Sequence, residues 1–368
     1  MITSWIASGG SAGEIALALV LLFVGIALIV KGGDFFVDAA SWIAEVSGLP
    51  QILIGATVVS VATTLPELIV SIIATADGSV EIAVGNAVGS VVANLGLIMA
   101  ISLFFMPGKA ERKDYLFKSA VLVVAVLNLL LIGFFGGMQD GNHVLTVGMG
   151  FVVLELFFLF VGENVYTAVK TLKNPVLNGL TPEASGSTVN MSAGEDVKVP
   201  AEAPAEEEAE PVKKDKKTVL VNVLKFIGGA AGIVGGAKLL VSNGQKLALA
   251  AGVPEGIIAV TLVAIGTSLP ELVTTITAII KKKASISVGN IIGANILDMT
   301  LILPVCAMVA GGALVFPKQS LILDIPFCLG LSLIAVVPML ITKKFHRWQG
   351  IALFVVYAAY LTLRILFT

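Results

Sequence analysis

Apolar residues along this chain come in runs of about twenty, separated by short polar connections. A helix of that length rises about 30 Å, which matches the hydrocarbon core of a bilayer, so each run is typical of a membrane-spanning helix. We expect ten such helices, at about residues 12–32, 50–76, 82–106, 115–136, 144–168, 219–242, 253–280, 285–314, 319–341 and 348–367. The pattern therefore predicts an all-α polytopic membrane protein with ten transmembrane helices.

The composition agrees with this fold class. Of the 368 residues, 57% are hydrophobic and only 13% are charged, whereas soluble domains carry roughly 25% charged residues. The formal net charge of -2 leaves no basic surface of the kind that binds nucleic acid, so we expect no nucleic-acid partner. Cys306 and Cys328 lie within apolar runs and lack the spacing of metal ligands, which disfavours a zinc site or a disulfide framework.

The distribution of basic residues predicts the orientation of the chain in the membrane. Most lysines and arginines fall in alternate connections, at 107–114, 169–218, 281–284 and 342–347. Because cytoplasmic loops are enriched in basic residues, we expect these connections inside and both termini outside. We expect a multi-pass protein of the cell membrane whose partners include the lipid bilayer, with no obligatory protein partner.

The composition changes abruptly between residues 174 and 217, which include the Pro-, Ala- and Glu-rich run PAEAPAEEEAEPVKKDKK. A segment with so little apolar surface cannot bury a core, so we expect a flexible cytoplasmic linker. The linker divides the chain into two halves, residues 1–173 and 218–368.

The two halves contain an internal repeat. Residues 48–98 align with 252–302 without a gap, at a shift of 204 positions, and about 19 of the 51 aligned positions are identical. The copies lie five helices apart, and an odd number of crossings places them in opposite orientations. We therefore expect two inverted five-helix repeats, an arrangement typical of secondary transporters whose site lies near the bilayer midplane.

The polar residues of each repeat cluster around a proline. Pro66 and Pro270 remove a helical hydrogen bond, which leaves the carbonyl groups of Ala62 and Gly266 without their usual donor. A glutamate follows each proline, and the next helix of each copy contains a further amide or carboxylate. The candidate residues are Thr63, Thr64, Glu67, Ser90, Asn94, Thr267, Ser268, Glu271 and Asp298.

These side chains predict a cation site. A carboxylate at bilayer depth is costly unless it meets a cation or water, so intramembrane acids indicate function. No histidine or thiol accompanies them, and an all-oxygen site suits hard cations such as calcium and sodium, although manganese and a purely structural acid network stay open. No nucleophile and base occur together, so we expect a transporter without a cofactor and not an enzyme. A channel is the remaining class, which the inverted duplication disfavours.

At these residues the chain resembles the cation/calcium exchanger superfamily, specifically the prokaryotic sodium/calcium exchangers with two alpha repeats. The resemblance is carried by the elements TTLPE and GTSLPE, each followed by GNAVGSVVAN or GNIIGANILD. It implies alpha-1 and alpha-2 motifs at 48–98 and 252–302, a cation site made by the second, third, seventh and eighth helices, and alternating access by sliding of the first and sixth helices. The sliding helices would span roughly 12–46 and 219–249.

The resemblance also implies roles for single residues. It makes Glu67 and Glu271 the central calcium ligands, supported by Thr63 and Thr267, with Asn94 and Asp298 lining the same centre. Flanking sodium positions would be formed by Thr64, Ser90, Ser268 and the carbonyl groups of Ser60 and Ala264. The implied function is exchange of sodium for calcium, with the two cations excluding each other from one site.

Two departures from the family pattern leave the coupling open. Ala294 stands where a serine ligand is common, and Val91 stands where asparagine is frequent. The sequence leaves open the stoichiometry, the selectivity for calcium over strontium or manganese, the oligomeric state, and protons or potassium as the coupling ion. Outside the repeats, we expect Lys31, Asp34 and Asp38 to extend toward the membrane surface or to form ion pairs between helices, and not to bind the cation. For Glu155, in the fifth helix, we expect a structural role in preference to a proton-sensitive one.

Overall fold

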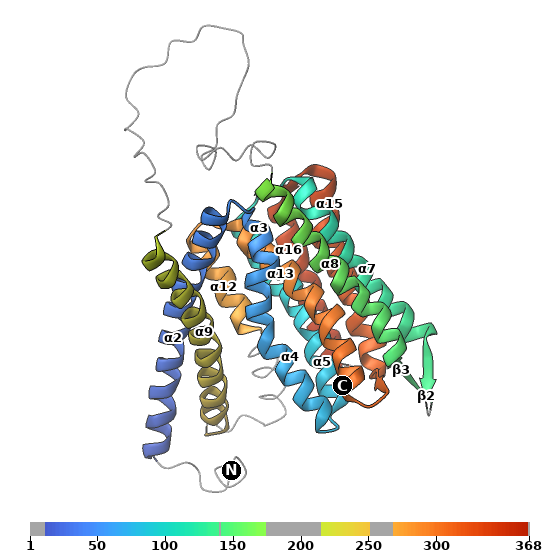
Figure 1. The fold of residues 1–368 in the computed structure, drawn as a ribbon. Coiled ribbons are helices and arrows are strands. Elements are labelled where there is room, and N and C mark those ends of the chain that lie inside the picture. The colour runs from blue at the N-terminus through green and yellow to red at the C-terminus, as the bar shows by residue number, and fades with distance from the viewer. Residues whose placement is uncertain (1–11, 140, 174–214, 251–267, 367–368) are drawn as a thin grey trace.

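The computed structural model of the protein describes residues 12–139, 141–173, 215–250 and 268–366 (Figure 1). Most of the expected linker at 174–217, together with Thr267 and Ala264, lies outside the described residues. The described part of the chain is a bundle of long helices joined by short connections. The predicted all-α polytopic fold is confirmed.

The first half contains five helical spans, three of them unbroken and two interrupted by a π-helical turn. The second and third spans carry these turns, η1 and η2, in their interiors. In chain order the elements are α2 (Ala12–Ser47), α3 (Gln51–Ile54), η1 (Gly55–Val59), α4 (Ser60–Ala76), α5 (Val80–Ala93), η2 (Asn94–Met99), α6 (Ala100–Phe105), α7 (Arg112–Phe135) and α8 (Val147–Lys173).

The second half has the same order of spans over the residues described, but not all of its π-helical turns fall in the equivalent places. The π-helical turns η5 and η6 lie in the eighth and ninth spans, counted along the whole chain. The elements are α9 (Lys216–Ala250), α12 (Leu269–Ile280), α13 (Ala284–Leu297), η5 (Asp298–Ile302), α14 (Leu303–Val309), η6 (Ser320–Asp324), α15 (Ile325–Thr342) and α16 (Arg347–Leu366). Within the described residues nine helices are long and apolar enough to cross a membrane, and the expected span at 253–280 is seen only from Leu269.

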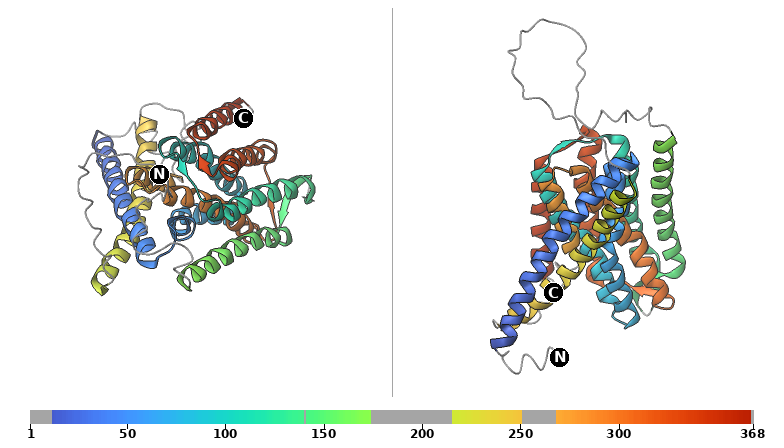
Figure 2. Two further views of the ribbon diagram at one scale, coloured as in Figure 1. Left: turned by 90° about the horizontal axis from the view of Figure 1, so that it is seen from above. Right: turned by 60° about the vertical axis from the view of Figure 1, so that its left-hand side comes forward.

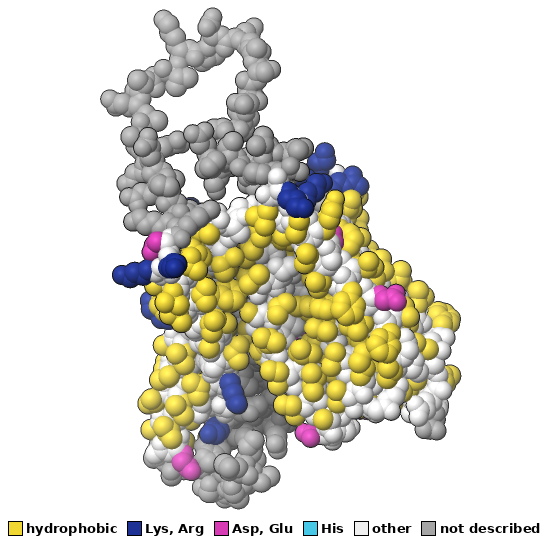
Figure 3. All heavy atoms as spheres, viewed as in Figure 1, with side chains coloured by type: hydrophobic (Ala, Val, Ile, Leu, Met, Phe, Trp, Pro, Cys, Tyr) yellow, Lys and Arg dark blue, Asp and Glu magenta, His cyan; other side chains and the backbone are white. Residues whose placement is uncertain are grey.

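The helices differ strongly in burial. In the span Ala284–Val309, 83% of an apolar stretch of 18 residues is buried in the protein, whereas in the span Gly13–Ser47 only 17% of such a stretch is buried. The helix α13 therefore lies at the centre of the bundle, and α2 lies at its edge. Hydrophobic side chains cover much of the flank of the molecule, and lysine and arginine side chains gather mainly around its upper end (Figure 3). This is the surface expected of a protein surrounded by lipid.

The two long outer helices, α2 and α9, pack against each other at one side of the bundle (Figure 2). Glycines bring their backbones into contact: a Cβ atom added at Gly25 would lie 2.9 Å from the carbonyl oxygen of Gly236, and one at Gly32 would lie 2.8 Å from that of Gly229. Such small residues allow close helix packing in membranes. The extent predicted for the two long helices is confirmed within a few residues at each end.

Short strands in the connections between helices pair with one another, a feature that the sequence did not predict. The strand β1 (Gly108–Lys109) pairs with β5 (Lys344–Phe345). In a second sheet β3 pairs antiparallel with both β2 and β4. The bounds of these three strands are Gly137–Gln139 for β2, Asn142–Thr146 for β3 and Ala313–Val315 for β4.

These strands correct two predicted boundaries. The fifth helix begins at Val147 and not at 144, and the eighth ends at Val309 and not at 314. Leu145 and Leu314 are fully buried in the core, so their apolar character extended the helical runs read from the sequence. A short buried strand and the end of a buried helix look alike in hydropathy.

Candidate cation site

The first group of candidate site residues lies on α4. Thr63, Thr64 and Glu67 are all buried, and Glu67 is only 1% exposed. Thr63 and Glu67 are four residues apart, so their side chains leave the same face of the helix. The helix continues through Pro66, and α4 packs against α5 and α13. The glutamate is therefore held in the interior of the bundle.

The second repeat supplies two further carboxylates. Glu271 lies in the first turn of α12, next to Pro270, and Asp298 begins the π-helical turn η5. Both are 1% exposed. Asn94, which occupies the position equivalent to Asp298 in the first repeat, likewise begins the π-helical turn η2. Turns of this kind occur often at functional sites, where they change the direction in which side chains leave a helix.

The three carboxylates lie close enough to repel one another. Glu67 interacts electrostatically with both Glu271 and Asp298, and Asp298 with Glu271. Several oxygens here are buried and lack a hydrogen-bond partner among the described residues. They are Oε2 of Glu67, Oε2 of Glu271, both carboxylate oxygens of Asp298, Oδ1 of Asn94, Oγ1 of Thr64 and Oγ of Ser268. Buried oxygens of this number without donors fit a site that receives a cation.

The donor set defines the kind of cation. In the part of the chain that the structure describes, no group of three or more Asp, Glu, His or Cys side chains is placed to hold a metal ion by itself. A cation at Glu67 and Glu271 would therefore draw on neutral oxygens such as those of Thr63 and Asn94. An oxygen-only set that mixes carboxylate with hydroxyl and amide groups suits calcium or sodium and disfavours softer metals.

Hydrogen bonds connect the two repeats at this centre. The Thr63 hydroxyl donates to Oδ1 of Asn290 at 3.1 Å, and Nδ2 of Asn94 donates to Oδ1 of Asn295 at 3.1 Å. The Thr63 hydroxyl also lies within hydrogen-bonding reach of the Glu271 carboxylate. Side chains separated by about two hundred positions in the chain thus meet at one place.

The remaining predicted residues are buried as well. Ser60, Ser90 and Ser268 are at most 4% exposed. The Ser60 hydroxyl donates to the carbonyl oxygen of Thr57 at 3.2 Å, and the Ser60 carbonyl lies 3.3 Å from the Thr63 hydroxyl. All nine predicted site residues that the structure describes are therefore in the interior, while the positions of Thr267 and Ala264 are not part of the described residues.

Three asparagines near the site were missed in the sequence. Asn86 donates from Nδ2 to the carbonyl oxygen of Glu67 at 3.2 Å and to Oγ of Ser71 at 2.9 Å, while Asn290 and Asn295 accept the bonds described above. A signal was available for two of them, since Asn86 and Asn290 follow glycines at equivalent repeat positions. Asn295 has Val91 as its counterpart, so the repeat gave no signal for it.

Glu155 lies away from this centre. It is exposed on α8, and its neighbours Phe151, Val152 and Phe158 are exposed as well. A side chain on the outer surface of the bundle cannot contribute to the central site.

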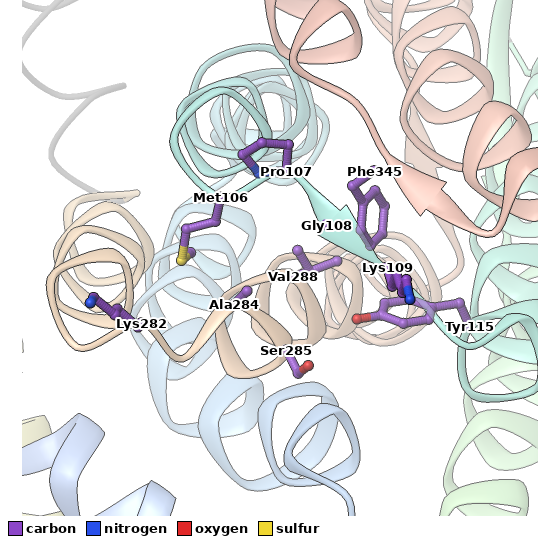
Figure 4. Close-up of a pocket in the computed structure, with 10 residues that line it drawn as sticks. All are labelled: Met106, Pro107, Gly108, Lys109, Tyr115, Lys282, Ala284, Ser285, Val288 and Phe345. Carbon is purple, nitrogen blue, oxygen red and sulfur yellow. The ribbon is translucent and has the colours of Figure 1, made fainter. Parts of the chain in front are cut away.

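Two cavities also lie outside the carboxylate centre. One of about 260 Å³ is bordered by the α6–α7 connection, β5 and the start of α13; its lining includes Lys109, Lys282 and Tyr115, and no carboxylate among the described residues (Figure 4). The other, of about 360 Å³, lies between α3, α7 and α8, and its lining includes Lys118 and Glu163, which form a partly buried ion pair at 3.4 Å. Neither includes a predicted site residue.

Comparisons with known proteins agree with the fold. The family model described as "Sodium/calcium exchanger protein" matches residues 17–164 and 221–366. The chain is 31% identical over 356 residues to the sodium/calcium exchanger MaX1 of Methanosarcina acetivorans, covering 94% of this chain and 98% of that protein. It is also 31% identical over 300 residues to the inner membrane protein YrbG of Escherichia coli, with 80% of this chain and 81% of YrbG covered.

A solved structure has the same fold. The sodium-calcium exchanger NCX_Mj, soaked with 10 mM Na+ and zero Ca2+, superposes with a TM-score of 0.72 at 27% sequence identity. The superposition covers 95% of this chain and 99% of that one.

Proposed function

The chain belongs to the sodium/calcium exchanger protein family, and from that membership together with the buried carboxylates we propose that it exchanges sodium for calcium across the membrane as a secondary active antiporter. The observation that carries the proposal is the group of three buried carboxylates, Glu67, Glu271 and Asp298, contributed by both repeats. An ion-transport role accounts for this otherwise costly burial of mutually repelling acids.

Mutual exclusion would couple the two fluxes. The carboxylates offer enough negative charge for one calcium ion or for a small number of sodium ions, and shared ligands would prevent both from binding together. The empty, charged site is costly to move through the bilayer, so the protein would change its access only when a cation neutralises it. Sodium entering down its gradient would then drive calcium out.

We assign the ligands in accordance with this scheme. Glu67 and Glu271 would bind calcium together with Thr63 and Thr267. Asn94 and Asp298 would line the same centre. Sodium positions on either side would use Thr64, Ser90, Ser268 and the carbonyl groups of Ser60 and Ala264. The unpartnered oxygens of Thr64 and Ser268 support the assignment of these two residues.

The outer helix pair would provide alternating access. The backbones of α2 and α9 are in contact at their glycines, so we expect the two helices to move together. Only 17% of an apolar stretch of 18 residues is buried in each of these two spans. Few core contacts would therefore oppose sliding of the pair against the rest of the bundle. Such motion would open the central site first to one side of the membrane and then to the other.

The topology follows from the basic residues. We place both termini outside and residues 174–217 in the cytoplasm as a linker between the halves 1–173 and 218–368, in a multi-pass protein of the cell membrane. Calcium and sodium would be transported substrates and not resident cofactors.

Transport by the purified protein tests the proposal. Uptake of calcium-45 is measured in proteoliposomes loaded with sodium, potassium or choline, with an imposed pH gradient as a separate condition. We expect uptake to require internal sodium. Uptake that follows only the pH gradient or internal potassium would assign a different coupling ion to the same fold.

A further inference from the structure

Two amides on the central helix α13 contact predicted cation ligands without belonging to the predicted ligand set. Asn290 and Asn295 are both 0% exposed. Each accepts one hydrogen bond from the first repeat, Asn290 from the Thr63 hydroxyl and Asn295 from Nδ2 of Asn94. We propose that Asn290 and Asn295 are positioning residues that orient Thr63 and Asn94 toward the transported cation. This inference rests on the proposed function.

The direction of the two hydrogen bonds supports this role. A hydroxyl group has one proton, and when Thr63 donates it to Asn290 its lone pairs remain available to a cation. The Glu271 carboxylate also lies within reach of this proton, so donation to Asn290 would leave the Glu271 oxygens to the cation. Asn94 donates through its nitrogen, and its Oδ1 has no partner among the described residues. In both cases the amide on α13 takes the hydrogen and leaves an oxygen free.

The nitrogen atoms of the two amides argue against a role in stability alone. Nδ2 of Asn290 and Nδ2 of Asn295 are buried and find no acceptor in the described part of the chain. An unpaired buried donor destabilises the fold, so an apolar residue of similar shape would serve packing better. The accepting oxygen is what each asparagine contributes.

Close backbone packing makes the contact between Thr63 and Asn290 possible. A Cβ atom added at Gly289 would lie 2.6 Å from the carbonyl oxygen of Ile52, and one added at Gly293 would lie 2.5 Å from that of Ala56. At these glycines α13 therefore touches the segment that leads into α4. The short asparagine side chain between them can then reach the ligand on α4.

The equivalent positions in the first repeat are bonded differently. Asn86, which aligns with Asn290, donates to Glu67 and Ser71 within its own repeat. Val91, which aligns with Asn295, has no polar atom to offer. Asp298, the counterpart of Asn94, has both carboxylate oxygens without a partner among the described residues. The positioning is therefore one-sided: α13 orients ligands of the first repeat.

Substitutions that remove the acceptors test the proposal. We expect Asn290→Leu and Asn295→Leu each to raise the KM for calcium in sodium-driven uptake about tenfold, equivalent to ~1.4 kcal/mol, with a smaller change in the maximal rate. The matched control is Asn164→Leu: Asn164 is also buried, on α8, and donates within its own helix, to the carbonyl oxygen of Phe160 at 2.7 Å. We expect this variant to keep the wild-type KM.

A double-mutant cycle separates positioning from a structural role. If Asn290 acts through Thr63, then Asn290→Leu will have no further effect on KM in a Thr63→Val background, and Asn295→Leu none in an Asn94→Leu background. Additive effects, or an unchanged KM in the single variants, would overturn the proposal. For a Leu variant that does not fold, Asn290→Ala or Asn295→Ala, which also removes the accepting oxygen, takes its place in the cycle.

Calcium binding keeps this inference distinct from the proposed function. Equilibrium binding of calcium-45 to the purified protein is measured for the same variants. If wild-type protein binds calcium but does not exchange it for sodium, the proposed function fails. The double-mutant cycle, measured on the calcium-binding affinity, then still tests whether Asn290 and Asn295 position Thr63 and Asn94. Wild-type protein that does not bind calcium would overturn both.

Discussion

The Lys281 ammonium lies 2.7 Å from a carboxylate oxygen of Asp38, and this ion pair joins the α12–α13 connection to the outer helix α2. A carboxylate oxygen of Asp34 lies 3.5 Å from the same nitrogen. Of the two alternatives expected for these aspartates, the ion pair between helices is the one that the structure shows. We expect α2 to slide during transport. The two ion pairs connect this helix to the part of the bundle that carries Glu271.

Removing this link should change transport more than stability. The Lys281 side chain is 21% exposed and that of Asp38 is 54% exposed, so solvent screens the pair, and we expect Lys281→Met to lower the free energy of unfolding by at most about 1 kcal/mol. The maximal rate of sodium-driven calcium uptake should change, because the pair must break or shift when α2 slides. Lys282→Met, at an exposed neighbouring residue, is the control. Equal rates in the two variants would contradict a role in the access change.

Gly289 of the second repeat should tolerate substitution less well than Gly85, its equivalent in the first. A Cβ atom at Gly289 would lie 2.6 Å from the backbone of the second span, whereas Gly85, its repeat equivalent, has no atom within 4 Å of such a Cβ. We expect Gly289→Ala to destabilise the protein by about 1–3 kcal/mol and Gly85→Ala to have little effect. Thermal unfolding in detergent compares the two. A similar loss of stability in both variants would contradict the difference in packing between Gly289 and Gly85.

The central carboxylates should be indispensable for transport. Replacing Glu67 or Glu271 by glutamine removes a negative charge while keeping the shape, and a loss of about 3 kcal/mol in cation attraction would lower calcium transport roughly 100-fold. The protein should stay folded, because the change relieves repulsion between buried acids. Calcium-45 uptake and gel filtration measure the two effects.

Glu155→Gln provides the matched control for these variants. Glu155 is exposed on α8, outside the centre, and we expect this variant to transport calcium at the wild-type rate. Normal exchange in both Glu67→Gln and Glu271→Gln would refute the site assignment.

The alanine at position 294 should weaken sodium binding. Ala294 is fully buried on α13, between Gly293 and Asn295, and it provides no oxygen. We expect Ala294→Ser to add a ligand near the site and to shift the sodium dependence of calcium uptake toward lower concentrations. An unchanged sodium curve would show that this position does not contribute to the sodium sites.

The sequence predicted much of this architecture because membrane spans and duplication leave strong signals. Runs of apolar residues located the helices, and the alignment of Glu67 with Glu271 marked the centre of the bundle. The nine described candidates were all expected in the interior, and all are buried there. A carboxylate inside an apolar run is conspicuous in a sequence because its burial is so costly.

The features that were missed depend on contacts between distant segments. Nothing near Asn295 in the sequence indicates that it meets Asn94, which lies 201 positions away. The strand β4 pairs with β3 of the other repeat, and its buried Leu314 resembles the end of a helix in hydropathy. One sequence carries local periodicity but not the pairing of segments.

Simultaneous measurement of both ion fluxes tests the central claim most directly. Proteoliposomes are loaded with sodium-22, calcium-45 is supplied outside, and both isotopes are followed in the same vesicles, for wild-type protein and for Glu271→Gln. We predict that calcium enters only as sodium leaves, in a fixed ratio, and that both fluxes disappear together in the variant. Calcium entry without sodium exit, or sodium exit that continues in Glu271→Gln, would contradict exchange at one shared acidic site.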